Sequence, residues 1–261
     1  APTLNLLLPA NTSYATTARA LNYTSTDTNP DTCWYSLNGG ANNTLAGCAN
    51  TTFTAIQGSN YINLYANDTY GNLNSTSVYF SVDSIAPQLT LILPANTTYN
   101  STARPLNYTA VDGNRDKCWY SLNGNADVNI IGCLNTSIIA LEGANELNLF
   151  SNDTYGHTNS TSVYFSVDSI YPQVNILLPQ AITYGSKTRP LNFTATDLNL
   201  DECLYSLNGG ANTSSCNNAT LTAIEGTNDV RVCANDTAGN MNCTSVNFIV
   251  DTIAPAIAIQ S

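Results

Sequence analysis

The sequence repeats itself with a nearly constant period, and this property constrains the fold more than any other feature. The segment Cys33–Gly39 returns 85 residues later at Cys118–Gly124, and it returns again at Cys203–Gly209 with one substitution. The segment Ser77–Ile85 returns unchanged at Ser162–Ile170. A period of this length predicts a row of similar domains. We expect domains at residues 1–85, 86–170 and 171–253, followed at residues 254–261 by the first strand of a further repeat or by a strand donated to a neighbouring subunit.

Within each repeat, apolar and polar side chains alternate in short runs. In the first repeat Leu4, Leu6 and Leu8 alternate with their neighbours, and Val78 and Phe80 do so near its end. Alternation over runs this short is typical of half-buried strands, and no stretch keeps the 3.6-residue spacing of an amphipathic helix. The sequence therefore predicts an all-β fold with three tandem β-sandwich domains of the immunoglobulin or fibronectin type III kind, and a small barrel is the alternative. About seven strands are expected in the first repeat, near residues 3–9, 19–26, 32–38, 44–48, 52–57, 60–67 and 76–83.

The composition excludes several kinds of partner. The net charge is −11, and charged residues make up only 10% of the 261 residues. A chain this acidic has no electrostatic attraction for nucleic acid or for anionic lipid. No apolar run approaches the roughly 18 residues of a membrane helix, so we expect no membrane span in this segment. Because charged side chains are scarce, solubility has to come from another source.

Three short motifs resemble those of prokaryotic Ig-like surface repeats. Val82–Pro87 and Val250–Pro255 are similar to the "V-D-T-x-A-P" junctions of that family. Cys233–Asn240 resembles its "A-x-D-x-A-G-N" turn, and Tyr35–Gly40 resembles its "Y-S-L-D-G-G" strand and turn, with Asn38 in place of the aspartate. The resemblance covers all three repeats. It implies an archaeal or bacterial protein of the kind found in S-layer-like coats, adhesins and filaments, or as an accessory module of secreted enzymes.

The eight cysteines are placed as disulfide pairs. One pair occupies the same place in every repeat, and a second pair flanks the last hairpin of the third repeat. Each disulfide that closes so short a loop contributes about 3 kcal/mol in the chain-entropy model. Zinc is a poor alternative because no two cysteines are close together and His157 is the only histidine. The expected disulfides, which imply an oxidising compartment, are Cys33–Cys48, Cys118–Cys133, Cys203–Cys216 and Cys233–Cys243.

Asn-x-Ser/Thr motifs recur at four positions in every repeat, and they predict a coat of N-glycans. Such a coat would supply the hydration that charge does not. Asn22 stands between Leu21 and Tyr23, so its side chain points to solvent if those two point to the core. The alternative is that the repeat was duplicated with an Asn-Thr bias and few motifs are used. The expected sites are Asn22, Asn107 and Asn192; Asn50, Asn135 and Asn218; Asn67, Asn152 and Asn235; and Asn74, Asn159 and Asn242.

Acidic residues gather in loops that would meet at the junctions between repeats. Asp112, Asn114 and Asp116 have the spacing that opens a calcium loop, but the glycine and glutamate that complete an EF-hand are missing. In an Ig-like sandwich this loop shares a pole with the loop of Asp153 and faces the preceding Asp83. These five residues would then hold a calcium ion that stiffens the array. The interpretation that we favour is that each aspartate caps its own turn.

An enzyme is not expected. His157 is replaced by asparagine in the other two repeats, which indicates a surface histidine with satisfied hydrogen bonds. A carbohydrate-binding module is the main competitor, because Trp34 and Trp119 could stack on sugar rings. Leu204 takes their place in the third repeat. Leucine keeps the apolar volume and loses the flat ring, so a packing role is favoured.

These observations predict a non-catalytic structural protein of the cell surface. We expect a glycosylated rod of Ig-like repeats that builds an extracellular filament, an S-layer-like coat or an adhesin stalk. The alternative is an array of carbohydrate-binding or adhesion modules of a secreted enzyme or adhesin. The expected partners are neighbouring copies of the same chain or repeat and covalent N-glycans. No cofactor other than the calcium ion at the junctions is predicted.

Overall fold

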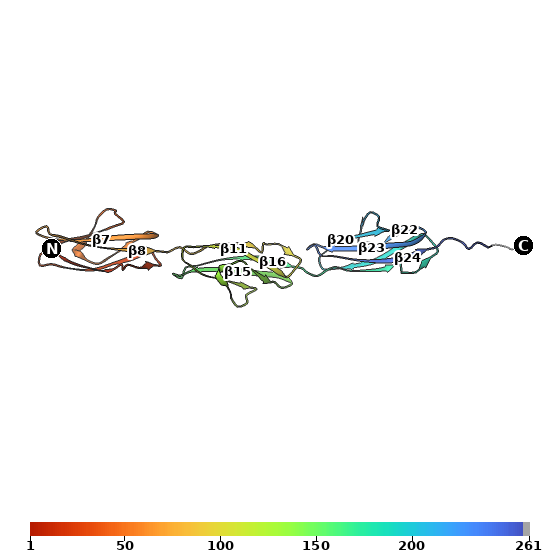
Figure 1. Cartoon of the computed structure of the whole chain (residues 1–261), viewed down its shortest axis with the longest axis horizontal. Helices are drawn as coiled ribbons and strands as arrows, with labels where there is room; N and C mark the ends of the chain where they lie inside the picture. The colour runs from red at the N-terminus through yellow and green to blue at the C-terminus, as the bar shows by residue number, and fades with distance from the viewer. Residues whose placement is uncertain (258–261) are drawn as a thin grey trace. The chain divides into compact units, whose positions relative to one another are not determined.

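The structure, a computed structural model, describes residues 1–257 and consists almost entirely of β-strands (Figure 1). The helical elements within that range are short 3-10 helices at Ala46–Cys48 and Ile131–Cys133. None of the described helices has the length and apolar character needed to cross a membrane. The chain forms tandem β-sandwich domains, as the alternation of apolar residues predicts.

The first repeat contains eight strands, one more than the sequence indicates. The additional strand, β2, pairs in parallel with Ser81 and Val82 at the end of β8. Two residues are too few for an alternation to be recognised, which explains why β2 is not predicted. The strand expected at residues 44–48 ends at Leu45 and continues as a 3-10 helix. The strands are β1 (Thr3–Leu8), β2 (Ser13–Tyr14), β3 (Ala18–Thr26), β4 (Pro30–Leu37), β5 (Asn43–Leu45), β6 (Thr51–Thr54), β7 (Gly58–Asp68) and β8 (Leu73–Val82).

The second and third repeats contain the same eight strands in the same order. The strands of the second repeat are β9 (Gln88–Leu93), β10 (Thr98–Tyr99), β11 (Ala103–Val111), β12 (Arg115–Leu122), β13 (Val128–Ile130), β14 (Thr136–Ile139), β15 (Gly143–Asp153) and β16 (Thr158–Val167). Those of the third repeat are β17 (Gln173–Leu178), β18 (Thr183–Tyr184), β19 (Thr188–Thr196), β20 (Leu200–Leu207), β21 (Thr213–Ser214), β22 (Ala219–Thr222), β23 (Gly226–Asp236) and β24 (Met241–Val250).

Contacts between residues divide the chain into two compact units, which are described separately. The first unit consists of Ala1–Ile92, Asn107–Thr136 and Asn148–Ser162. The second unit consists of Leu93–Leu106, Ser137–Leu147 and the chain from Val163 onward. The domain boundaries expected from the repeat, after residues 85, 170 and 253, stay a prediction.

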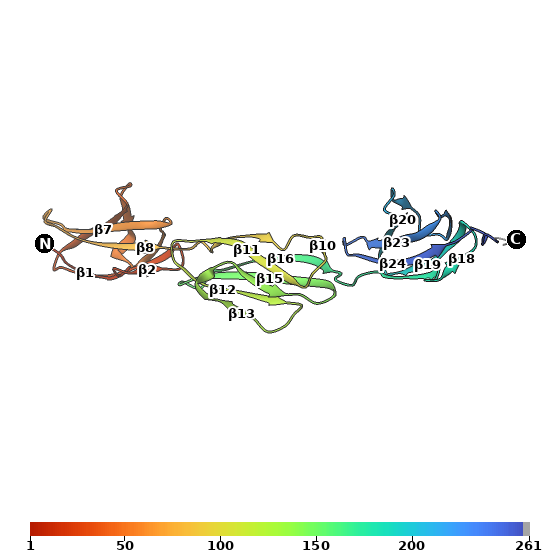
Figure 2. The same ribbon diagram turned by 45° about the vertical axis from the view of Figure 1, so that its right-hand side comes forward.

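In the first unit, the first repeat forms a sandwich of a three-stranded and a five-stranded sheet. The strand orders are β1-β3-β6 and β2-β8-β7-β4-β5, and β7 and β8 lie side by side in both views (Figures 1 and 2). Leu21 on β3 and Ile62 and Leu64 on β7 are completely buried between the sheets. Phe53 on β6 and Phe80 on β8 complete this core with an edge-to-face ring contact. The buried positions alternate along each strand, as expected for a strand with one face in the core.

In the second unit, the third repeat forms the same sandwich. Its strand orders are β17-β19-β22 and β18-β24-β23-β20-β21. Leu191, Val230 and Val232 are completely buried in its core, and Phe248 takes the place that Phe80 has in the first repeat. The strands of the second repeat follow the corresponding orders, β14-β11-β9 and β10-β16-β15-β12-β13.

The strand expected at residues 254–261 is not observed in the described part of the chain. Residues 254–257 have no regular secondary structure and no buried side chain, and Ile257 is 88% exposed. The rest of the expected strand, residues 258–261, lies outside the described residues. A strand needs hydrogen-bonded neighbours to form, and residues 254–257 pair with no strand among residues 1–257.

Candidate functional site

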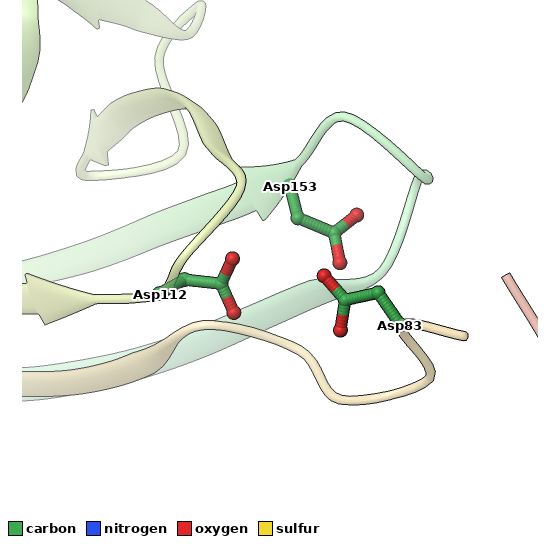
Figure 3. Close-up of side chains that lie close together, drawn as sticks. All are labelled: Asp83, Asp112 and Asp153. Carbon is green, nitrogen blue, oxygen red and sulfur yellow. The ribbon is translucent and has the colours of Figure 1, made fainter. Parts of the chain in front are cut away.

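Three aspartates from separate segments converge in the first unit, at the place where the first repeat passes into the second. Asp83 follows β8, Asp112 follows β11, and Asp153 is the last residue of β15. One carboxylate oxygen from each lies within 4.8 Å of the others. Figure 3 shows the three side chains pointing toward one another. Asp83 and Asp153 are buried, and Asp112 is half-buried.

Asp83 is held by amide side chains from both repeats. The Asn114 side chain donates a hydrogen bond from Nδ2 to Asp83 Oδ2 at 2.6 Å, and Gln57 donates from Nε2 to Asp83 Oδ1 at 2.8 Å. The hydrogen bond from Asn114 lowers the pKa of Asp83 below its ordinary value; burial opposes it, and the bond from Gln57 adds to it. Asp83 is therefore an anion that ties the end of one repeat to a loop of the next.

Asp153 and His157 form a second contact at this junction. Asp153 Oδ1 accepts hydrogen bonds from the backbone N–H groups of Tyr155 and His157, at 2.8 and 2.9 Å. The His157 ring lies between Asp153 Oδ2, 2.7 Å from Nδ1, and the Ala15 carbonyl oxygen of the first repeat, 2.8 Å from Nε2. The histidine has satisfied hydrogen bonds, as expected, but its side chain is only 24% exposed and contacts the preceding repeat.

The carboxyl and the imidazole of this pair each favour the charged state. Burial raises the pKa of Asp153, but the hydrogen bonds from His157 and from Tyr155 outweigh burial and lower that pKa below its ordinary value. The hydrogen bond to Asp153 raises the pKa of His157 above its ordinary value, although burial opposes it. Both His157 ring nitrogens have partners, so neither is free for acid–base chemistry with a substrate in this arrangement.

The second unit contains an equivalent cluster between the second and third repeats. Asp168, Asp197 and Asp236 offer carboxylate oxygens within 4.8 Å of one another. Asn199 donates from Nδ2 to Asp168 Oδ2 at 2.7 Å, as Asn114 does to Asp83. Asn240 stands where His157 stands in the second repeat, and only 1% of it is exposed.

Asn240 contacts both repeats through one amide nitrogen. Its Nδ2 donates to Asp236 Oδ2 and to the Asp168 carbonyl oxygen, both at 2.7 Å. Burial raises the pKa of Asp236, but the hydrogen bonds from Asn240 and from the backbone of Ala238 outweigh it, so the pKa lies below its ordinary value. The same place in the fold therefore holds an ionisable contact in the first unit and a neutral donor in the second.

The residues predicted for calcium are brought together in part. Asp83, Asp112 and Asp153 meet, and Asn114 contacts Asp83. Asp116 is not part of the cluster; it is exposed, and its carboxylate lies 4.0 Å from Lys117 Nζ. Asp116 lies on β12, after the turn that carries Asp112. Because successive residues of a strand point to opposite faces, the direction of its side chain is set by the strand and not by the turn. The sequence spacing does not reveal that β12 begins at Arg115.

The cluster is compatible with both interpretations made from the sequence. Carboxylate oxygens are the ligands that calcium prefers. The turn-capping role is also present, because Asp112 Oδ1 accepts the Asn114 N–H at 2.7 Å and Asp153 Oδ1 accepts two backbone N–H groups. Gln57, which holds Asp83 and accepts the Ser84 N–H through Oε1 at 2.8 Å, is not among the residues that the sequence predicts for this site. Its signal is the repeat itself, because glutamates occupy its place in the other repeats and accept the corresponding N–H groups.

All four expected disulfides are present. The pair Cys33–Cys48 ties β4 to the end of the first 3-10 helix, and Cys118–Cys133 does the same in the second repeat. Cys203–Cys216 ties β20 to the segment after β21. The fourth disulfide joins Cys233 and Cys243, which are direct cross-strand partners on β23 and β24. The bonds and their sequence separations are Cys33–Cys48 and Cys118–Cys133 with 15 residues, Cys203–Cys216 with 13, and Cys233–Cys243 with 10.

The tryptophans lie on the outer faces of the five-stranded sheets. Trp34 stacks on its cross-strand partner Tyr65 with ring centroids 5.4 Å apart. In the third repeat the same two ladder positions hold Leu204 and Cys233. A ring that stacks on a neighbouring side chain has one face covered, which favours the expected packing role over a sugar platform. Of the tyrosines on this face, Tyr79 is 67% exposed.

The twelve predicted glycosylation asparagines occupy four places in the fold. The Asn22 group lies on the middle strand of the three-stranded sheet, and the Asn50 group lies directly before β6 and its counterparts. The Asn67 group lies near the end of β7 and its counterparts, and the Asn74 group near the start of β8 and its counterparts. The Asn22 and Asn67 groups are half-buried and the Asn50 and Asn74 groups exposed. The groups are Asn22, Asn107 and Asn192; Asn50, Asn135 and Asn218; Asn67, Asn152 and Asn235; and Asn74, Asn159 and Asn242.

Comparison with known proteins yields similarity in fold. No protein-family model matches the sequence, and no curated protein sequence matches it. Among solved structures, the fibronectin(III)-like modules of Clostridium thermocellum CbhA are 17% identical, cover 67% of this chain and 100% of their own, and give a TM-score of 0.38. A Ca²⁺-stabilised adhesin of an Antarctic bacterium that binds ice is 18% identical over 98% of this chain and 75% of its own, with a TM-score of 0.37.

Ig-domain proteins are also similar. The N-terminal eight Ig domains of Down Syndrome Cell Adhesion Molecule are 13% identical to this chain, with a TM-score of 0.43. The match covers 96% of this chain but 37% of that one, so this chain spans about a third of its length. At these identities the likeness concerns the fold alone. The tandem β-sandwich domains of this chain are established by its own sheet topology.

Proposed function

We propose that this chain is a non-catalytic structural protein of the cell surface. It is a glycosylated tandem array of Ig-like repeats that builds an extracellular filament, an S-layer-like coat or an adhesin stalk. The observation that carries the proposal is the contact between the last aspartate of one repeat and an asparagine of the next. It occurs in both units, as Asn114 to Asp83 at 2.6 Å and Asn199 to Asp168 at 2.7 Å.

A contact of this kind connects one repeat mechanically to the next. A hydrogen bond to an ionised carboxylate is roughly twice as strong as one between neutral groups. Its cross-repeat position limits how one repeat can move against the next. The His157 bridge to Ala15 and the Asn240 bridge to Asp168 add a second such contact in each unit. Repeats that are tied to their neighbours at two places suit a protein that transmits force or maintains spacing.

The extracellular location is supported by the disulfides. Four disulfides join all eight cysteines, and disulfides persist in oxidising compartments. The proposed partners are neighbouring copies of the chain or repeat and covalent N-glycans. A glycan coat accounts for a surface that is rich in asparagine, threonine and serine and poor in charge.

The alternative function, a carbohydrate-binding or adhesion module of a secreted enzyme or adhesin, is favoured by one observation. Tyr79 and Tyr164, at equivalent places on the outer sheet faces, are 67% and 61% exposed. Exposed aromatic rings can stack on sugars. Asn247 occupies this place in the third repeat, so a platform would be limited to the first two repeats.

Calcium at the junctions stays a prediction. The carboxylates of Asp83, Asp112 and Asp153 supply the oxygen ligands, and the cluster in the second unit repeats the arrangement. The hydrogen bonds described above supply a role for the same oxygens without a cation.

Location and assembly in the native source test the proposal. Antibodies against the chain should label the cell surface or filaments in electron microscopy, and extracted material should contain assemblies of the chain. A polysaccharide pull-down distinguishes the alternative. Specific retention by a polysaccharide that is lost in a Tyr79→Ala and Tyr164→Ala double variant would contradict the structural function and support the binding function. A Tyr70→Ala variant, which removes an exposed tyrosine outside the sheet face, is the control.

A further inference from the structure

The asparagine of one glycosylation motif is exposed but makes hydrogen bonds within its own domain. Asn74 Nδ2 donates a hydrogen bond to the Pro2 carbonyl oxygen at 2.8 Å, and Asn74 Oδ1 accepts the Ser75 N–H at 2.8 Å. Pro2 is buried and directly precedes β1, whereas Asn74 lies on β8. Because β1 and β8 belong to different sheets, this contact closes the sandwich where the repeat begins.

The same contact recurs in both other repeats. Asn159 Nδ2 donates to the Pro87 carbonyl oxygen at 3.0 Å, and Asn242 Nδ2 donates to the Pro172 carbonyl oxygen at 2.9 Å. Each asparagine also accepts the N–H of the next residue. We call this contact the Asn–Pro clasp. The clasp is present in all three repeats.

Strand geometry explains why this side chain lies beside the Pro2 segment, although Asn74 itself is exposed. Side chains two residues apart on a strand share a face. Asn74 therefore lies on the same face of β8 as Val78, which packs against the core, and Phe80, which is 4% exposed. A sugar on Nδ2 would remove one of its two N–H groups and place a ring beside the buried Pro2 segment. The sugar and the clasp thus use the same nitrogen, which would keep a single N–H for the Pro2 carbonyl oxygen.

The asparagines of two other groups, those of Asn22 and Asn50, do not use their side-chain nitrogen for a hydrogen bond in the described part of the chain. Asn22 lies between Leu21 and Tyr23, which are 0% and 5% exposed, so its side chain is on the opposite, solvent face of β3. Asn50 uses only its oxygen, which accepts the Tyr23 N–H at 3.0 Å. Within residues 1–257, no hydrogen bond is recorded for Nδ2 of either asparagine. Their counterparts, for which the same holds, are Asn107 and Asn192 for the first and Asn135 and Asn218 for the second.

We propose that the amide hydrogen bonds decide which motifs carry glycans. The Asn22 and Asn50 groups carry them, and the Asn–Pro clasp asparagines Asn74, Asn159 and Asn242 stay unmodified. This inference rests on the glycan coat of the proposed function. The same criterion assigns two further sites, Asn11 and Asn96, which are exposed at the centres of tight turns.

The modification requires an activated sugar donor. Nδ2 forms a bond to the anomeric carbon of a glycan carried on a lipid phosphate, and the bond from that carbon to the phosphate oxygen breaks. The lipid phosphate leaves, and one amide proton passes to a base of the transferase. A sugar leaves the stability of the fold unchanged only where the Nδ2 that carries it is not needed for a hydrogen bond in the folded protein.

Mass spectrometry of intact glycopeptides from the native protein gives the first test. Peptides that contain Asn22, Asn50 or Asn11 should carry added sugar mass, and peptides that contain Asn74 or Asn159 should be bare. Glycans on the clasp asparagines at the same occupancy as on Asn22 would overturn this inference and leave the glycan coat intact. A protein without sugar at any motif would overturn the glycan coat and the inference together.

Paired variants made in the native host give the second test. Thr76→Val destroys the motif of Asn74 but keeps its amide, whereas Asn74→Asp removes the donor nitrogen. Only Asn74→Asp should lower the melting temperature of the first repeat, by about 5 °C. Asn22→Asp and Thr24→Val both remove one glycan and should have equal effects. An equal loss for Thr76→Val and Asn74→Asp would show that the sugar, and not the clasp, is what this position supplies.

Discussion

The two junctions of the molecule use the same positions with different chemistry. In the first unit, His157 connects Asp153 to the Ala15 carbonyl oxygen through its two ring nitrogens. In the second unit, Asn240 connects Asp236 to the Asp168 carbonyl oxygen through one amide nitrogen. The histidine is 24% exposed in its side chain, and the asparagine residue is 1% exposed.

The difference teaches what the junction requires. The position needs a donor for the aspartate and a polar contact to the preceding repeat, and two unlike side chains meet both needs. The two side chains differ in how they respond to pH and in how much stability is lost when a hydrogen-bond partner is removed. Asn240 is neutral at every accessible pH but is buried, so its unmet hydrogen bonds would be costly. His157 is ionisable, with a pKa that its hydrogen bond to Asp153 raises, and it can be hydrated.

Removal of the aspartates should give the largest effect. Asp236→Ala removes one of the acceptors of the buried Asn240 amide and leaves the backbone N–H groups of Ala238 and Asn240 without their carboxylate acceptor. A loss of about 2–4 kcal/mol in unfolding free energy is expected. Asp153→Ala should cost less, because His157 can turn to water. Denaturant unfolding of the full chain measures both. The control is Asp116→Ala, which removes an exposed carboxylate. Equal losses for the two aspartates would contradict the role given to burial.

Loss of the hydrogen bonds from Asn114 and Asn199 to the junction aspartates should lower the unfolding free energy by a smaller amount, similar in both units. Asn114→Ala and Asn199→Ala each remove a hydrogen bond to a carboxylate, which corresponds to about 1.5–3 kcal/mol at most. Thermal unfolding with hydrogen exchange at the Asp83 and Asp168 segments would show the loss. Asn29→Ala, at the corresponding place in the first repeat, is the matched control. An unchanged exchange rate at both segments would show that these two hydrogen bonds do not fix one repeat to the next.

The pH response should distinguish the junctions next. The raised pKa of His157 means that its stabilisation is complete below about pH 6.5 and is lost as the pH rises through its folded value. The lowered pKa of Asp153 and of Asp236 means that their stabilisation is present above about pH 3.9 and is lost as the pH falls through the folded values. Only the first junction should therefore weaken between neutral and alkaline pH.

Substitution of the histidine tests this difference. Melting curves of the full chain at pH 5.5 and pH 9 should converge in the His157→Asn variant, because asparagine has no proton to lose. The reverse change, Asn240→His, should introduce an alkaline loss in the second unit. The interpretation fails if His157→Asn keeps the alkaline decrease of the native chain. Hydrogen exchange, corrected for its intrinsic pH dependence, assigns any decrease to a junction.

Chelation should have the smallest effect. The carboxylate oxygens already have hydrogen-bond partners, so a calcium ion would add to an existing contact. If calcium binds, excess EGTA lowers the melting temperature in both units, and Asp112→Asn abolishes the response of the first junction alone. Asp197→Asn should act on the second. An unchanged melting temperature in EGTA would leave these aspartates as turn caps.

The fold could be predicted because its signals are local and repeated three times. The alternation of Leu4, Leu6 and Leu8 indicates a strand wherever it occurs, and the 85-residue period states how often the domain recurs. The disulfides followed from the same register, since cysteines at one place in every repeat have equivalent neighbours. The strand β2 could not be predicted, because two residues show no period and depend on the end of β8 for their hydrogen bonds.

The site could be predicted only in part, for a physical reason. The sequence places Asp83, Asp112 and Asp153 in loops that the sandwich brings to one pole, so their meeting follows from the fold class. It cannot show that Asp116 turns away on β12 or that the His157 ring reaches the Ala15 carbonyl oxygen. Those outcomes depend on where a strand begins and on the distance between loops, which are set by packing.

The repeat, the fold class, the cysteine pairs and the acidic loops were determined by the sequence itself, because each depends on residue type and spacing. The tertiary structure alone decided what the polar side chains do. Asn22 and Asn74 stand in the same kind of three-residue motif, yet the Asn74 amide donates to the Pro2 carbonyl oxygen whereas the Asn22 amide lies on the outer face of β3. A motif fixes which atoms are present, whereas their hydrogen bonds depend on which face of which strand carries them.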